Sequence, residues 1–538
     1  MIRAHIMPLT ILLPLVGAYF ILLVGSKFRN LARNVALVTT GATFAMVCFI
    51  TYLVSNQGNL VYHLGGWAPP LGIELQADPI TAFLLLTFAG VSFFVILFAY
   101  DILPAEISPK VITRYYALYL VLLGSLLGIV LSNDFFNMYV FLEISSIAAA
   151  ALVAINGDKL AMEASVKYLV MSTLGSGTVL MGIAGLYMVT GYLNLDYLAG
   201  ALPQAYASYP LTVLMTLAML TVGIAVKAAL FPLHVWLPDA HGSAPTSSSA
   251  ILSGLVVKVY IAVLLKLLYR VFPLDFLTTL PLQGSLLVMA TLGIFIGSIM
   301  AIRQKDIKKM LAYSTVAQIG YVFLGIGLFS EKAMTGAILH VFNHAVMKSM
   351  LFLSVGLLIK YSGCRKIDDL AGLGRVYPIP MIAFSVGALS LVGIPPLSGF
   401  ISKWYLGLGA LEANQLPFLL VLLLSSLLNG FYYMPIVIAG FFKKETVEIQ
   451  KQVVPLGAQI SLIVLIVATF FFGLFSNLAV DFLTPTVQGL FNVFGGECKA
   501  HVQHNQYFTL NFGLAPHPRD GGGSDRRTFW RPIAQSCD

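Results

Sequence analysis

Apolar runs of about twenty residues recur along the chain from residue 6 to about residue 480, separated by short polar segments. A run of this length crosses the hydrocarbon core of a bilayer as a helix, because each residue advances a helix by about 1.5 Å. The pattern therefore predicts an all-α polytopic membrane protein with about 14 transmembrane helices. The first run, residues 6–25, lacks a clear small-residue cleavage site, and we expect a retained helix rather than a signal peptide.

Two predicted spans contain a helix break. Proline interrupts residues 210–238 at Pro232 and residues 377–409 at Pro395-Pro396. Backbone groups freed by proline are tolerated at membrane depth only where protein or water covers them. These spans, helices 7 and 12, are five apart and so cross in opposite directions. The arrangement is typical of two inverted five-helix repeats with an ion site at the discontinuous helices. The alternative is two unrelated proline kinks.

The pattern predicts five parts of the chain. They are helices 1–3 in residues 1–110, a first repeat (helices 4–8) in residues 111–270, a second repeat (helices 9–13) in residues 283–442, helix 14 in residues 456–480, and a polar tail in residues 496–538. The tail contains a Gly-Gly-Gly run and no apolar periodicity. We expect it to be disordered and dispensable for ion movement.

Composition agrees with a membrane protein, since only 10% of residues are charged against about 25% in soluble proteins. The net charge of +8 does not indicate a nucleic-acid partner, because the basic residues gather in alternate loops. Before the tail, the other loops hold only Arg3, Arg270 and Lys332. The positive-inside rule then predicts a multi-pass protein of the cell (inner) membrane with both termini outside.

Several ionisable residues remain inside the predicted spans, where one charge costs roughly 2.5–3.5 kcal/mol on insertion scales. The deepest are Glu143, Lys227, Lys258, Lys348 and Lys403. Burial disfavours a charged lysine and a nearby carboxylate favours it, so moving one partner of a Glu–Lys pair switches the amine. For any single lysine, a structural ion pair or a misplaced helix end is the alternative. Lys266 lies near Arg270 and the outer surface, and we expect it to snorkel to water.

Histidines extend this set. His340, His344 and Lys348 are spaced by four residues and share one helix face. Because histidine titrates near neutral pH, such a row joined by water forms a proton path. Packing roles are the alternative. His234 and His241 flank the first helix break, where proton entry and loop-end capping are equally open. Asp134 precedes a span as a helix cap would.

The sequence carries no sign of a cofactor or metal. Its four cysteines form no CxxC pair and no metal-ligand spacing. There is no GxGxxG after a strand and no P-loop pattern, so we expect no nucleotide site.

Five stretches of sequence carry a resemblance to a known family: Asn133–Glu143, Val226–His241, Ser243–Lys258, His340–Lys348 and Gly393–Lys403. Over about residues 75–445 the chain resembles the antiporter-like proton-conducting membrane subunits. These include the L, M and N subunits of respiratory complex I (NADH–quinone oxidoreductase), the D-type subunits of multisubunit Na⁺/H⁺ antiporters, and the matching subunits of membrane-bound hydrogenases. The chain is too short for the fifteenth span and lateral helix of the longest members.

The resemblance implies a role for each buried residue. Glu143 would pair with Lys227 and modulate it, and Lys258 would connect the first half-channel to the central axis. His344 and Lys348 would continue the central axis of proton-carrying residues, and Lys403 would be the exit-side proton carrier. It also implies a non-redox proton-pumping subunit without a bound cofactor. The expected partners are other membrane subunits of one complex, the lipid bilayer, and protons, with sodium left open.

Two other functions compete with this interpretation. A stand-alone cation/proton antiporter or solute carrier would work without partner subunits. A haem-bearing electron-transfer subunit would use the membrane histidines, but bis-histidine haem needs facing histidines, usually on different helices, and His340 and His344 share one helix.

Overall fold

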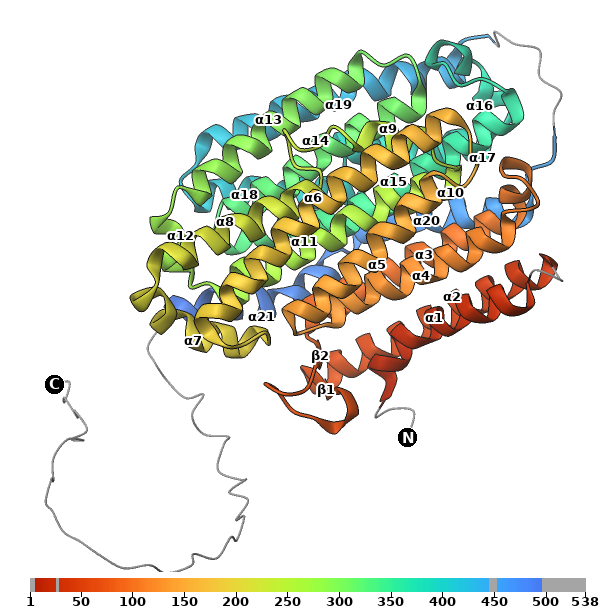
Figure 1. Ribbon diagram of the computed structural model, residues 1–538. Coiled ribbons are helices and arrows are strands. Elements are labelled where there is room, and N and C mark those ends of the chain that lie inside the picture. The colour runs from red at the N-terminus through yellow and green to blue at the C-terminus, as the bar shows by residue number, and fades with distance from the viewer. Residues whose placement is uncertain (1–4, 26–28, 445–451, 496–538) are drawn as a thin grey trace, which may run out of the picture. The chain divides into compact units, whose positions relative to one another are not determined.

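The structure is a computed structural model that describes residues 5–25, 29–444 and 452–495. Its helices are α1 (Ile6–Val24), α2 (Arg29–Gln57), α3 (Pro79–Glu106), α4 (Ile112–Leu131), α5 (Phe135–Val153), α6 (Lys159–Thr190), α7 (Leu195–Ser208), α8 (Pro210–Lys227), α9 (Leu237–Ser243), α10 (Thr246–Ile251), α11 (Val257–Lys266), α12 (Leu274–Thr279), α13 (Leu282–Ile302), α14 (Ile307–Gly327), α15 (Glu331–Ser362), α16 (Leu373–Val376), α17 (Pro378–Val392), α18 (Ser398–Glu412), α19 (Leu416–Phe442), α20 (Leu456–Leu474) and α21 (Ser476–Gly495). The long helices lie side by side and run in roughly one direction (Figure 1). The predicted tail at 496–538 lies outside the described residues.

Thirteen helices of the described residues are long and apolar enough to cross a membrane, judged by length and composition. One of them, helix 8, runs from Thr246 to Val271 as α10 and α11 with π-helical turns at Leu252–Val256 and Leu267–Val271. The pair α17–α18 is not among the thirteen because each half has 15 residues. Counted as one broken span, it completes the number that the sequence predicts.

Both predicted helix breaks are present. The first follows Lys227, where α8 ends and nine residues separate it from α9. The second separates Val392 from Ser398 and begins at Gly393, whose φ of 95° suits glycine because it has no Cβ. The inverted relation between the two halves stays a prediction.

Short elements cover one end of the bundle (Figure 1). Strands β1 (Leu60–His63) and β2 (Glu74–Ala77) form an antiparallel pair, and α7 and α12 lie at the same end. The α16 turn lies at the opposite end. Neither the strands nor these short helices follow from the pattern of apolar runs.

The chain after residue 452 forms two helices. The range predicted for helix 14, residues 456–480, covers α20 and the first residues of α21. Helix α21 packs against α15, α3 and α12, and the ring of Phe491 lies 5.6 Å from that of Tyr269. This helix does not follow from the pattern of apolar runs.

Burial divides the helices into central and peripheral ones. Helix 8 and α15 are almost entirely buried, so they form the centre of the bundle. Peripheral helices expose large apolar side chains, as expected for lipid-facing surfaces: Val38, Leu174, Met188, Val288, Leu423 and Phe442. The ionisable residues described next lie on or against the central helices.

Candidate functional site

Glu143 and Lys227 form an ion pair within the bundle. Lys227 is the last residue of α8, and its Nζ lies 3.4 Å from Oε1 of Glu143 on α5. The lysine side chain is fully buried, whereas that of the glutamate is 30% exposed. Nζ also donates to Oγ of Ser146 at 2.7 Å and of Ser172 at 3.1 Å. These three oxygens match the three N–H donors of an ammonium group.

A cluster of hydroxyl groups that the sequence analysis missed surrounds this pair. The Tyr260 hydroxyl of α11 lies 3.1 Å from Ser145 Oγ and 3.4 Å from Ser146 Oγ. Lys227 Nζ lies 5.3 Å from the centroid of the Tyr260 ring. Ser146 follows Glu143 by three residues and so shares its helix face, which is the one sequence signal that points to it.

Lys258 is fully buried two residues beyond the first π-helical turn of helix 8. Its Nζ donates to the backbone oxygen of Ser253, which belongs to that turn. No carboxylate of the described residues pairs with it. π-helical turns leave the regular backbone ladder and are frequent at functional sites.

His340 and His344 lie at the centre of the bundle on α15 with their rings stacked 5.8 Å apart. His340 Nδ1 is 2.9 Å from Ser402 Oγ, and its Nε2 is 3.1 Å from Gln318 Oε1. His344 is fully buried, and neither ring nitrogen has a hydrogen-bond partner among the described residues. Buried polar atoms are usually paired, so this histidine has unused capacity for a proton or a water molecule.

Lys348 continues the row one turn further along α15. Its Nζ donates to the Leu311 backbone oxygen at 2.8 Å and to Ser314 Oγ. The Tyr433 hydroxyl lies 3.4 Å from Nζ and 2.8 Å from Ser314 Oγ. The Lys348 amine is therefore hydrogen-bonded only to neutral oxygens among the described residues.

Lys403 of α18 reaches back across the second helix break. Its Nζ donates to the backbone oxygens of Leu391 and Val392 at 2.7 and 3.0 Å, and to Ser426 Oγ at 2.9 Å. These carbonyls are in the last turn of α17, where the break removes their helical donors. Tyr321 lies between this lysine and the histidine row, with its ring centroid 4.8 Å from Lys403 Nζ and 5.4 Å from the His340 ring.

The histidines beside the first break are also buried. His241 on α9 is fully buried, and neither of its ring nitrogens has a partner in the described part of the chain. Its ring lies 6.2 Å from Trp236 and 6.3 Å from Phe352. His234 lies against Phe231, with 5.3 Å between their rings.

Asp134 caps a helix, as its sequence position suggests, and accepts from the Asn137 amide at 2.8 Å. It precedes the first residue of α5. Burial raises the pKa of its carboxyl group.

The expectation that Lys266 snorkels to water is wrong. Its Nζ is buried and donates to the backbone oxygens of Val130 at 2.6 Å and Ser132 at 2.8 Å. These carbonyls lie at the end of α4, and β1–β2 and α7 cover this end of the bundle.

Within the described residues, no three or more His, Cys, Asp or Glu side chains are grouped to hold a metal ion.

The chain belongs to the family described as NADH:quinone oxidoreductase/Mrp antiporter, TM, which its residues 132–429 match. The N subunit of the NADH-quinone oxidoreductase of Desulforudis audaxviator is 38% identical over 449 residues, 82% of this chain and 87% of that protein. The D subunit of the Na(+)/H(+) antiporter of Alkalihalophilus pseudofirmus is 31% identical over 440 residues, 81% of this chain and 87% of that protein.

A solved structure of a respiratory membrane complex contains a chain with the same fold. A chain of the membrane-bound sulfane sulfur reductase, an archaeal respiratory membrane complex, is 30% identical and superimposes with a TM-score of 0.84. The match covers 91% of this chain and 98% of that chain. The predicted resemblance and the all-α polytopic membrane class are thereby confirmed.

Proposed function

We propose that this protein is a proton-translocating, antiporter-like subunit of a multisubunit membrane complex. The observation that carries the proposal is the pair of Glu143, partly exposed, and Lys227, fully buried. A carboxylate at this distance favours the charged amine, and burial opposes it. Withdrawal of Glu143 therefore releases a proton from Lys227, and its return draws one in.

The first groups that can accept the proton released by Lys227 are side-chain hydroxyls. Ser146 and Ser172 accept from Lys227, and Tyr260 is hydrogen-bonded to Ser146. Lys258 lies two residues before Tyr260 in helix 8, and we assign it the connection from the first half to the central axis. A chain of hydroxyls and water transfers protons without moving a heavy ion across the bilayer.

In the second half of the chain, the proposed proton path continues along α15 and ends at its exit. His340, His344 and Lys348 share one face of this buried helix. The nitrogens of His344, which have no partner in the part of the chain that the structure describes, can accept and donate a proton. Lys403 at the second break is assigned to the exit side. We assign proton entry to His234 and His241 at the first break.

The same proposal includes orientation, repeats and partners. The two described ends of the chain support termini on one side: His5 Nδ1 lies 2.8 Å from the Tyr62 hydroxyl of β1, and α21 packs against α12. With the positive-inside rule, this side is the outside of the cell (inner) membrane. We assign residues 111–270 and 283–442 to the two inverted repeats. The relatives named as subunits support other membrane subunits as partners.

The test is Glu143→Gln in the complete complex, with proton movement followed by a pH-sensitive dye in membrane vesicles. We expect the complex to assemble and proton movement to be lost, because the neutral amide no longer favours the charged Lys227. Glu143→Asp keeps the charge but retracts it, so partial activity is expected. The matched control is Glu331→Gln, in the first turn of α15, which should retain full activity.

Two results would contradict the proposal. Normal proton movement in an assembled Glu143→Gln complex would remove the pair from the mechanism. Full cation/proton exchange by the chain expressed without partner subunits would favour a stand-alone antiporter. Sodium flux measured in the same vesicles answers whether sodium moves as well.

A further inference from the structure

Lys266 is a buried amine that the pathway above does not use. It is the last residue of α11 and directly precedes the second π-helical turn of helix 8. Its Nζ donates to two backbone oxygens, which leaves one N–H without an acceptor among the described residues. No carboxylate there lies within ion-pair distance of it, so its direct hydrogen-bond partners are neutral oxygens.

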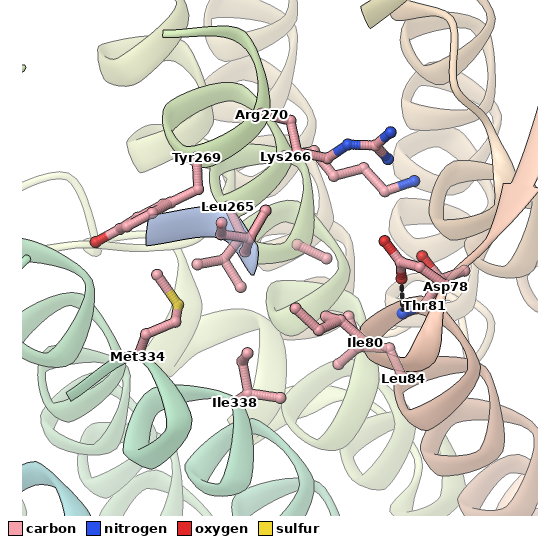
Figure 2. A pocket seen from close by; sticks show the side chains of 12 residues that line it. Asp78, Ile80, Thr81, Leu84, Leu265, Lys266, Tyr269, Arg270, Met334 and Ile338 are labelled. Atoms are coloured by element: carbon pink, nitrogen blue, oxygen red, sulfur yellow. Dashed lines mark hydrogen bonds between the residues drawn. The ribbon is translucent and has the colours of Figure 1, made fainter. Parts of the chain in front are cut away.

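A cavity of about 30 Å³ opens beside this amine. One water molecule needs roughly 10–15 Å³ of such space, so one or two fit. Its polar wall is formed by Asp78, Thr81, Lys266 and Arg270. Figure 2 shows the amine of Lys266 and the carboxylate of Asp78 pointing toward one another. A bridging water therefore has a donor on one side and an acceptor on the other.

The cavity lies between the central helix α15 and a surface ion pair. On one side it is lined by Ile338 of α15, the helix that also carries His340. On the other, Arg270 Nη2 pairs with Asp196 Oδ1 at 3.0 Å, and the Asp196 side chain is 55% exposed. Polar groups thus continue from the buried amine to the surface at the end covered by β1, β2 and α7.

We propose that Lys266 is a further proton-carrying residue at the release end of the pathway, and that it passes its proton to Asp78 through water in this cavity. In this step an N–H bond of the Lys266 ammonium breaks as an O–H bond forms on water. That water gives one of its protons to the Asp78 carboxylate, which loses it to the outer solution. Neutral Lys266 is recharged by the next proton along the pathway.

A purely structural role for Lys266 makes a different prediction. A cation at the end of α4 stabilises that helix through the helix dipole, and arginine does this equally well. Arginine does not release its proton in proteins. Lys266→Arg therefore keeps the cap and removes the proton carrier.

Asp78 offers a second, independent variant. Its Oδ1 accepts from the Thr81 amide at 2.7 Å and caps α3. Asparagine caps helices about as well as aspartate. Asp78→Asn therefore keeps the fold of this end and removes the carboxylate that receives the proton.

The experiment measures proton movement in vesicles containing the complete complex with Lys266→Arg, Asp78→Asn, Glu143→Gln, or the control Asp275→Asn. Asp275 is an exposed acid at the same end of the bundle that does not line the cavity. We expect assembled complexes, loss of proton movement in the first three, and normal movement in the control. If Lys266→Arg fails to assemble, Asp78→Asn alone decides.

This inference rests on the proposed proton pathway, and the variants separate the two. Normal movement in Asp78→Asn and Lys266→Arg, with Glu143→Gln inactive, overturns the role of Lys266 and leaves the pathway intact. Normal movement in Glu143→Gln overturns the pathway itself.

Discussion

At the scale of single residues, most of the buried lysine amines donate hydrogen bonds to neutral oxygens. Among the described residues, Lys227 alone of the proposed pathway has a carboxylate partner. Lys258, Lys348 and Lys403 donate to backbone carbonyls or hydroxyls. A carbonyl stabilises an ammonium group without becoming an unpaired charge when the proton leaves. Such sites release protons at lower cost than ion pairs, in which deprotonation strands a buried carboxylate.

Lys403 gives the residue-scale prediction. Lys403→Ala removes the titrating group, and Lys403→Arg retains a permanent charge, so we expect both variants to assemble and neither to move protons. Proton movement in vesicles is the measurement, with exposed Lys332→Arg as the control. An active arginine variant would show that the site needs only a fixed positive charge facing the carbonyls of Leu391 and Val392.

The sequence predicted the charged members of the site better than the neutral ones. A lysine or glutamate within an apolar run is conspicuous, so Glu143 and Lys227 could be paired before their contact was known. Ser146, Tyr260 and Gln318 are uncharged and so less conspicuous in an apolar run, and only the fold shows what they touch. Lys266 was misjudged because its distance from a helix end does not reveal that the end is covered.

At the scale of elements, close contact between α6 and α8 positions Lys227. Gly175 on α6 faces Gly223 on α8, and a Cβ added to Gly223 would lie 2.7 Å from the Gly175 backbone oxygen. Small residues allow membrane helices to approach in this way. The contact places Ser172, one turn from Gly175, within hydrogen-bond distance of Lys227.

Gly223→Ala tests this arrangement. The added methyl group forces the helices apart, and overpacking of this kind costs about 1–3 kcal/mol. We expect a lower melting temperature of the purified complex and reduced proton movement, because Lys227 moves away from Ser172. Gly177→Ala is the matched control, since its Cβ would meet nothing within 4 Å. Equal stability and activity in the two variants would contradict the proposed role of the contact.

Element boundaries followed from the sequence where a residue type dictates them. Pro232 and the Pro395-Pro396 pair marked both helix breaks. Helix α21 escaped prediction because its residues are less uniformly apolar than a span, and its position depends on contacts with α15, α3 and α12. The strands β1 and β2 are four residues each, too short for a clear alternating pattern.

At the scale of the whole molecule, the distribution of charge agrees with the arrangement of the two ends. The end that carries β1, β2, α7 and α12 also holds both described chain ends. The opposite loops contain nearly all the basic residues between spans. The number of spans and this asymmetry were predictable because both follow from local composition. The contacts that bring α5, α8 and helix 8 together were not, because they join residues far apart in sequence.

Orientation in the membrane follows from that asymmetry and can be measured directly. In a chain whose four cysteines are replaced by serine, single cysteines are introduced as Asp275→Cys, at the α12 end, and Lys305→Cys, in a basic loop. Basic loops stay in the cytoplasm because Lys and Arg resist translocation. A membrane-impermeant maleimide should therefore label Asp275→Cys in intact cells and Lys305→Cys only after permeabilisation. The reverse pattern would place the Lys266 cavity on the cytoplasmic side, and the proton-release role assigned to Asp78 would become one of uptake.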